Sequence, residues 1–348
     1  MKTFRLWLGK RGELRHEISC FLFHLEEVRQ GRLSLVLKVE AEAGFDWVGE
    51  LIPRPYEEEF SGTVTLYTSG TTGEPKAVTR RFADVIEGKR GRGSSTERWL
   101  LTYHPFRWAG VSMITHVLRW GAQLIVPESL EIGDVLTAAP LATHVSLTPS
   151  LFRKMLLTSS EVELSKLSFS QITFGGEPAT QPVLDAAKRC WPSARITHTY
   201  ASTELGDIWS VSDGLAGVPQ AKMSSLEFDS NGVLYVNGRS TGDVWRLDGK
   251  RYQFVGRVEE IVNVGGAKIY LASVDKAALE IQGVHEARTF AVSSAFVGQM
   301  VGLEYSGSIE PIEVRRALRA KLPKIACPAR VDRVESILLT SAGKVGHR

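Results

Sequence analysis

Residues 67–76 read YTSGTTGEPK and overlap the β-prone run TVTLYT at 63–68. The stretch combines hydroxyl side chains and glycines with one lysine. Glycine lets the backbone approach a ligand closely and adopt a positive φ, and successive backbone N–H groups can surround an anion. A loop of this kind after a buried strand predicts a phosphate-binding site. Its candidate residues are Thr68, Ser69, Gly70, Thr71, Thr72, Gly73 and Lys76.

Two other interpretations of this loop start from the same residues. Clusters of Gly, Ser and Thr are common in loops, so composition alone leaves a flexible surface linker open. The second is the GxxxxGK[ST] loop of P-loop NTPases. It does not match, because Pro75 precedes Lys76 and Ala77 follows it.

The rest of the chain indicates an α/β architecture. It has 348 residues, of which 43% are hydrophobic and 23% charged, which is ordinary for a soluble globular protein. Apolar residues have helical spacing at 150–157 and 182–191. Alternation of such helices with strand-like runs predicts an α/β fold. The strand-like runs lie at 63–68, 99–103, 122–127, 143–148, 170–176 and 232–238.

The pattern changes after about residue 257. We predict a boundary near Arg257–Glu260, with residues 1–256 forming a large α/β domain and 257–348 a small α+β domain. About 90 residues is a plausible size for a domain. The predicted elements are a hairpin at 259–270, helices at 273–281 and 311–322, and strands at 288–294 and 299–306.

Composition excludes several classes of protein. The formal net charge of +3 is too small to indicate nucleic-acid binding. Cys20, Cys190 and Cys327 are few, odd in number and far apart, which disfavours a disulfide framework or a zinc site and favours the cytoplasm. No run of about 18 apolar residues predicts a membrane span, and the N-terminal residues lack the apolar core of a secretion signal.

The segment YTSGTTGEPKAV at 67–78 resembles the signature loop YTSGTTGxPKGV of the adenylate-forming (AMP-binding) superfamily, and only Ala77 departs from it. The superfamily includes acyl-CoA and aryl-CoA synthetases, peptide-synthetase adenylation domains and luciferases. The resemblance implies a large α/β N-terminal domain and a small mobile α+β C-terminal domain. It extends over roughly residues 62–348, because further motifs follow in the family's order.

The first of these motifs is YASTE at 200–204, which resembles YGxTE. The resemblance implies that Tyr200 packs against adenine, that Thr203 contacts the α-phosphate and that Glu204 helps to hold Mg²⁺. Thr203 and Glu204 are thereby catalytic candidates. Ala201 stands where the family has a glycine, so the resemblance implies that its methyl group would narrow the space under the adenine. Taken alone, the pentapeptide would be a turn with a solvated glutamate.

The second and third motifs are STGDVW at 240–245 and FVGRVEEIVNVGGAKIY at 254–270, which resemble TGD and GRxDDxIKxxGxxI. Asp243 would accept hydrogen bonds from the ribose hydroxyls, since a carboxylate presents acceptors to a vicinal diol. Arg257 would be the second ribose contact and Glu259 the hinge. Gly265 and Gly266 would line the approach of the thiol. Without the family context, these residues would form an ordinary turn and a surface ion pair.

The last motif, SAGKVGHR at 341–348, resembles SGKxxR. The resemblance makes Lys344 the catalytic lysine, which bridges the incoming carboxylate and the α-phosphate. A lysine in a polar tail is usually only solvated. Its place at the end of an ordered series of motifs is what singles it out.

Two segments bear on the acid. PFRWAGV at 105–111 lies where relatives carry P-F-H-x-x-G, with Arg107 in place of the histidine. A buried arginine could pair with a second carboxylate of the substrate; alternatively Arg107 points outward and Trp108 fills the pocket. FGGEP at 174–178 resembles the GGAPL turn, which forms a pocket wall near the adenine. The candidates there are Phe174, Gly175, Gly176 and Glu177.

The resemblance as a whole implies an ATP-dependent acid–thiol ligase that uses ATP, Mg²⁺ and CoA on a small carboxylic acid. Short o-succinylbenzoate–CoA ligases have a comparable layout, including THVSLTPS at 143–150. Two alternatives stay open: a carrier-protein phosphopantetheine as acceptor, and a degenerate adenylate-binding protein without turnover. The phosphate loop comes early in the chain, so we expect a shortened N-terminal part, which a homo-oligomer could complement.

Overall fold

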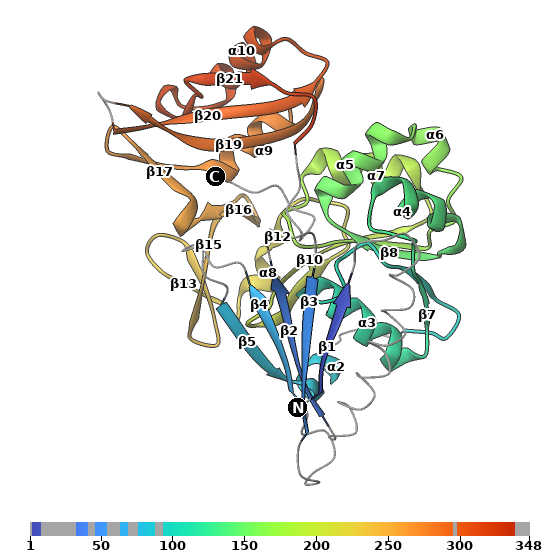
Figure 1. Ribbon diagram of the computed structural model, residues 1–348. Helices are drawn as coiled ribbons and strands as arrows, with labels where there is room; N and C mark the ends of the chain where they lie inside the picture. Colours follow the sequence, from blue (N-terminus) through green and yellow to red (C-terminus); the bar gives the residue numbers. More distant parts are fainter. Residues whose placement is uncertain are drawn as a thin grey trace. The chain divides into compact units, whose positions relative to one another are not determined.

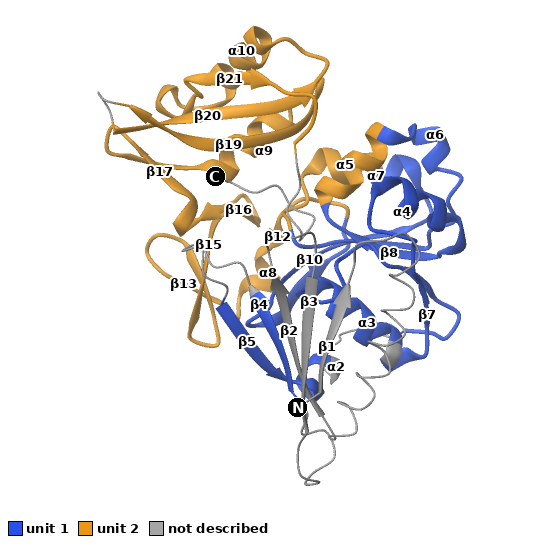
Figure 2. Ribbon diagram, viewed as in Figure 1, with its two compact units in different colours: residues 1–148, 158–176, 187–213 blue, residues 149–157, 177–186, 214–348 orange. Residues whose placement is uncertain are grey.

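The computed structural model describes residues 2–7, 33–40, 46–53, 63–68, 76–87, 93–294 and 298–337. Contacts divide the chain into two compact units, shown in Figure 2. The first contains residues 1–148, 158–176 and 187–213, and the second contains 149–157, 177–186 and 214–348. The boundary predicted near Arg257–Glu260 stays a prediction.

The centre of the first unit is a six-stranded sheet with the order β11-β10-β9-β8-β6-β7. Figure 1 labels its strands β10, β8 and β7. Its strands are parallel except β11, which pairs antiparallel with β10. Short apolar runs such as QITF form these strands because residues such as Ile172 and Phe174 are fully buried. The bounds are β6 Arg98–Leu100, β7 Gln123–Ile125, β8 His144–Leu147, β9 Gln171–Phe174, β10 Arg195–Ser202 and β11 Gly206–Val211.

Helices connect the parallel strands, as the right-handed crossover of α/β folds requires. They are α3 Trp108–Trp120, α4 Ile132–Ala138, η1 Ala139–Leu141, α5 Pro149–Thr158, α6 Glu161–Leu164 and α7 Gln181–Cys190. The helices predicted at 150–157 and 182–191 are confirmed as α5 and α7. The predicted α/β class is confirmed as well.

A second sheet of the first unit has five strands in the order β1-β3-β2-β4-β5. β2 and β4 are parallel, and the other neighbours are antiparallel. The β4–β5 hairpin pairs Thr68 with Lys76, so the two ends of the predicted phosphate loop lie opposite each other. The bounds are β1 Lys2–Trp7, β2 Leu33–Glu40, β3 Asp46–Pro53, β4 Thr63–Thr68 and β5 Lys76–Arg81, and α2 Phe82–Glu87 follows.

The second unit contains an antiparallel sheet with the order β12-β16-β15-β14-β13. Its long hairpin β15–β16 carries the TGD and GR motifs on adjacent strands. The middle of β15 is buried at Val244 and Trp245, whereas both ends of the strand are exposed. The bounds are β12 Val218–Pro219, α8 Gln220–Met223, β13 Glu227–Phe228, β14 Val233–Val236, β15 Arg239–Asp248 and β16 Arg251–Arg257.

The same unit contains a mixed sheet in the order β18-β17-β20-β19, and β21 pairs parallel with β20. Helices α9 and α10 bury apolar residues with its strands in one core, which includes Tyr305 and Leu318. The predicted hairpin, helices and strands of this region are confirmed. The bounds are η2 Val258–Glu260, β17 Ile261–Val264, β18 Ala267–Tyr270, α9 Leu271–Leu279, β19 Val284–Ser294, β20 Gly298–Gly307, α10 Pro311–Lys321, η3 Lys324–Ala326 and β21 Arg330–Arg333.

This core gives a stability prediction. Leu318 is fully buried, whereas the side chain of Ile312 on the same helix is 65% exposed. We expect Leu318→Ala to lower the free energy of unfolding by roughly 2–5 kcal/mol, because it removes buried methyl groups and leaves a cavity. The control Ile312→Ala should change it by less than about 0.5 kcal/mol. Urea denaturation followed by circular dichroism measures both, and equal losses would contradict this packing.

Candidate functional site

The carboxyl ends of parallel strands are the expected ligand-binding edge of an α/β sheet. Leu147, Phe174 and His198 lie in one row across β8, β9 and β10. The FGGEP and YASTE motifs continue from this row, and the PFRWAGV turn follows β6. The parallel sheet therefore brings three of the predicted motifs to the same edge.

The phosphate-loop hairpin is linked to this edge through Arg107. Its Nη1 donates to the main-chain oxygen of Tyr67 at 3.1 Å, two residues before Ser69. Burial lowers the pKa of the Arg107 guanidinium below its ordinary value, but arginine stays protonated in proteins. Lys76 begins β5 and is exposed. The predicted loop residues Ser69, Gly70, Thr71, Thr72 and Gly73 lie outside the described residues.

The PFRWAGV turn is closely packed where α3 begins. Trp108 is the first residue of α3, and the Arg107 amide donates to the carbonyl of His104 at 3.1 Å. A Cβ at Gly110 would lie 2.1 Å from that same carbonyl oxygen, so only glycine fits. The glycine thus lets the helix approach the turn that carries Arg107 and Trp108.

The FGGEP motif divides into a buried part and a turn. Phe174 has no exposed surface, so its side chain belongs to the core. The Gly175 amide donates to Leu147 O at 3.1 Å, and a Cβ on Gly175 would lie 3.1 Å from Thr199 Oγ1. Gly176 has a φ of 82°, which favours glycine. The two glycines therefore present main chain at the sheet edge.

The YASTE motif spans the end of β10 and the turn into β11. Tyr200 and Ala201 lie in β10, with an irregular register between them. Tyr200 stacks on Trp209 of β11, with ring centroids 5.5 Å apart and planes at 25°. Thr203 and Glu204 lie in the turn, where Glu204 is exposed. Trp209 was not predicted from the sequence; the hairpin-forming glycine at 206 is the signal that could have indicated its pairing with Tyr200.

The two predicted ribose contacts meet within the second unit. Asp243 on β15 is directly opposite Arg257 on β16, and Arg257 Nε lies 2.9 Å from Asp243 Oδ1. The Asp243 side chain is only 4% exposed, whereas that of Arg257 is 44% exposed. Glu259, the predicted hinge, lies in η2, 3.4 Å from Arg257 Nη1. The strand register thus brings both motifs together.

Gly265 and Gly266 form the two-residue turn between β17 and β18, where Val264 pairs with Ala267. Their φ angles are 53° and 88°, as a type I′ hairpin turn requires. A Cβ at Gly266 would meet no atom within 4 Å. The turn therefore needs these glycines for their backbone conformation, and its main chain is accessible.

Glu177 lies at the start of α5 in the second unit. Its Oε2 accepts a hydrogen bond from the Ser150 amide at 2.9 Å and lies 3.9 Å from Arg153 Nη2. A carboxylate at a helix N-terminus is electrostatically favourable. The structure therefore gives Glu177 a role in fixing α5 and Arg153.

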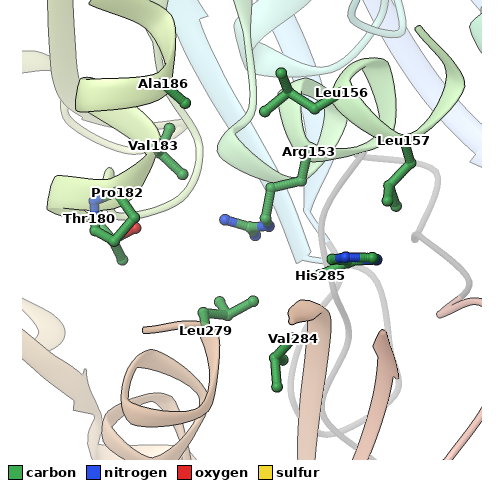
Figure 3. Close-up of a pocket in the computed structure, with 10 residues that line it drawn as sticks. All are labelled: Arg153, Leu156, Leu157, Thr180, Pro182, Val183, Ala186, Leu279, Val284 and His285. Atoms are coloured by element: carbon green, nitrogen blue, oxygen red, sulfur yellow. The ribbon is translucent and has the colours of Figure 1, made fainter. Parts of the chain in front are cut away.

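Arg153 also lines a hollow of about 180 Å³ in the second unit. Figure 3 shows its guanidinium between α5 and α7, with Leu279 of α9 and His285 of β19 nearby. Leu, Val, Pro and Ala side chains make up most of the lining. None of the residues predicted from sequence lines this hollow, although Glu177 contacts Arg153 at its edge.

The predicted residues thus fall into two groups, one in each unit. The first unit brings together the phosphate-loop ends, the PFRWAGV turn, Gly175, Gly176 and the YASTE turn. The second holds Glu177, Asp243, Arg257, Gly265 and Gly266. Lys344 lies outside the described residues. Within the described part of the chain, no helix is long and apolar enough to cross a membrane.

The fold and the order of its motifs are those of the adenylate-forming superfamily. A family model for the AMP-binding enzymes matches residues 21–225, more than half of the chain, and the protein belongs to the AMP-binding enzyme family. The resemblance predicted from the motifs is therefore confirmed.

Individual relatives are distant. The chain is 26% identical to gramicidin S synthase 2 of Brevibacillus brevis, with 81% of this chain and 8% of that protein covered. It is 24% identical to 2-succinylbenzoate–CoA ligase of Bacillus velezensis, with 85% and 70% covered. The chain spans less than a tenth of the length of the first curated relatives that it matches.

A solved structure shows the same fold. It is o-succinylbenzoate coenzyme A synthetase (MenE) from Bacillus subtilis in complex with ATP and a magnesium ion. The TM-score is 0.64 at 19% identity, and the match covers 88% of this chain and 71% of that chain.

Proposed function

We propose that the protein is an ATP-dependent acid–thiol ligase, which joins a carboxylic acid to AMP and then transfers the acyl group to a thiol. The observation that carries the proposal is the convergence of motifs at one sheet edge. There the Arg107–Tyr67 hydrogen bond of 3.1 Å joins the phosphate-loop hairpin to the PFRWAGV turn. Family membership supports the adenylation step.

In each unit, the residues present fit a part of a nucleotide. Glycine main chain at 175–176 and the Tyr200 ring, supported by Trp209, offer a surface for an adenine. In the second unit, Asp243 and Arg257 would supply acceptors and donors for the ribose hydroxyls. Lys76 and the main chain of residues 69–73 would hold the β- and γ-phosphates.

Glu204 fits as a ligand for Mg²⁺. Magnesium prefers oxygen ligands and is usually bound by one or two carboxylates together with substrate phosphates. Glu204 is an exposed carboxylate in the YASTE turn, so it would be one such ligand beside the phosphates of ATP. When bound, the ion would neutralise charge on the phosphate oxygens.

In the first step, a carboxylate oxygen of the acid attacks the α-phosphorus of ATP, and the bond to the β-phosphate breaks. The products are the acyl-adenylate and pyrophosphate. Catalysis of such a step depends on positioning and on stabilising phosphate charge. Thr203, Glu204 and Lys344 would serve it at the α-phosphate.

In the second step, a thiolate attacks the acyl carbon and AMP leaves. The accessible Gly265–Gly266 turn would lie along the path of the thiol. A rotation about Glu259 would exchange Lys344 for this turn between the steps, as domain gating does in other enzymes. This rotation is part of the proposal.

The proposal also covers the thiol that accepts the acyl group and the class of carboxylic acid. We favour CoA as the acceptor. Carrier-protein phosphopantetheine is the alternative, because the chain is as similar in sequence to gramicidin S synthase 2 as to the CoA ligase. The half-buried guanidinium of Arg107 favours an acid with a second carboxylate, because Arg binds carboxylates through paired donors.

The test is acid-dependent ATP–pyrophosphate exchange across small aryl, dicarboxylic and fatty acids. We expect exchange only when an acid is present, with the highest rate for an acid that has two carboxylates. Product assays with CoA and with a phosphopantetheinylated carrier protein then distinguish the acceptors. ATP binding without exchange for any acid would instead support the non-catalytic alternative.

A further inference from the structure

Arg80 lies on the strand that follows the phosphate loop. Side chains alternate along a strand, so Lys76, Val78 and Arg80 share one face of β5. Val78 and Arg80 are half-buried, whereas the neighbouring Thr79 and Arg81 are exposed. The strand face that begins with the exposed Lys76 is therefore partly buried at Val78 and Arg80.

The Arg80 side chain reaches two other motifs of the first unit. Its Nη1 donates a hydrogen bond to the main-chain oxygen of Thr203 at 3.2 Å. Its Cζ lies 4.8 Å from the centroid of the Trp108 ring, within range of a cation–π interaction. Arg80 therefore connects the strand after the phosphate loop with the YASTE turn and the PFRWAGV turn.

Gly206 provides the space for this contact. It has a φ of 77°, and a Cβ placed there would lie 3.1 Å from Arg80 Nη1 and 3.2 Å from Nη2. The guanidinium is therefore packed against the main chain that closes the YASTE turn.

The hydrogen bond to Thr203 O restricts the part of the turn that carries chemistry. The Thr203 carbonyl and the Glu204 amide belong to one planar peptide unit. A donor fixed on that carbonyl limits rotation of the peptide unit about the backbone bonds of Thr203 and Glu204. It therefore limits the directions of the Thr203 hydroxyl and the Glu204 carboxylate.

The guanidinium is suited to this task because it stays charged. Burial lowers the pKa of Arg80, and Asp84, Asp207 and Glu204 counteract that effect. Hydrogen bonds from a charged donor are about twice as strong as neutral ones.

We propose that Arg80 is a positioning residue for adenylation, which orients Thr203 and Glu204 through the Thr203 carbonyl. The inference rests on the proposed function for its catalytic consequence, but the orientation of the turn can be tested without turnover.

The experiment compares Arg80→Ala, Arg80→Lys and the control Arg81→Ala in the full chain. Arg81 is adjacent, but its guanidinium bonds Asp84 at 2.7 and 3.0 Å. We expect Arg80→Ala to lower kcat/KM in acid-dependent exchange roughly 10- to 100-fold, as for loss of a charged hydrogen bond. Arg80→Lys should recover part of the loss, and Arg81→Ala should match the wild type.

Two further measurements distinguish a positioning role of Arg80 from a loss of folding, and test that role independently of the proposed function. Hydrogen–deuterium exchange of residues 200–206 should accelerate in Arg80→Ala and not in Arg81→Ala. Added guanidinium ion, but not sodium at equal ionic strength, should restore exchange activity to Arg80→Ala. Unchanged deuterium uptake in this segment would overturn the inference. If the wild type shows no exchange with any acid, the proposed function fails, while deuterium uptake still decides whether Arg80 orients the turn.

Discussion

Replacing Lys344 by alanine should lower acid-dependent ATP–pyrophosphate exchange by roughly 10²–10³-fold, the usual cost of removing one fixed charge or donor from a transition state. The expectation rests on the motif SAGKVGHR. The α-phosphate gathers charge as the carboxylate attacks, and an ammonium group that contacts both reactants stabilises that charge more than it stabilises either reactant alone. The loss should therefore fall mainly on kcat.

The second half-reaction provides the internal control for Lys344. If a synthetic acyl-adenylate is supplied, transfer of its acyl group to CoA should proceed in Lys344→Ala at close to the wild-type rate, because the proposed rotation removes the lysine before the thiol attacks. Lys324→Ala is the matched surface variant, because Lys324 is exposed at the start of η3. Retention of exchange in Lys344→Ala, or equal losses in both half-reactions, would contradict this role.

Much of the fold could be predicted from the sequence, because local patterns agree with the tertiary structure there. The helix at 182–191 has apolar residues at helical spacing, and α7 is Gln181–Cys190. The glycine pair at 265–266 indicates a hairpin turn, and its φ angles are positive. In these segments periodicity and turn chemistry act within a few residues and agree with the tertiary contacts.

The candidate site was less predictable, since its geometry depends on pairing between distant strands. The motifs identified Asp243 and Arg257 individually, but only the β15–β16 register places them opposite each other. Arg80 was missed because an arginine in a strand with polar neighbours is usually solvated. The available signal was the spacing of Arg80, which lies two residues after Val78 and four after Lys76 and so on the same face of a strand. This spacing indicates a functional role only together with the contact to Thr203.

Asp243→Ala should lower kcat/KM for ATP by roughly 10- to 100-fold, mainly through a higher KM, because loss of hydrogen bonds to a charged acceptor costs about 1.5–3 kcal/mol. The Asp243 side chain is 4% exposed and its carboxylate lies 2.9 Å from Arg257 Nε, so the ion pair restricts its orientation; in the proposed function it accepts from the ribose hydroxyls. Asp248→Ala is the control, because Asp248 ends the same strand and is exposed.

The competing explanation for Asp243 is structural, because the variant also removes the partner of Arg257. That guanidinium is 44% exposed and water can solvate it, so we expect little change in the free energy of unfolding. A comparison of ATP with 2′,3′-dideoxy-ATP isolates the ribose contact. The wild type should discriminate between the two nucleotides, and Asp243→Ala should use them almost equally, since the deleted hydroxyls have then lost their acceptor. Undiminished discrimination in the variant would show that the carboxylate serves only its ion pair with Arg257.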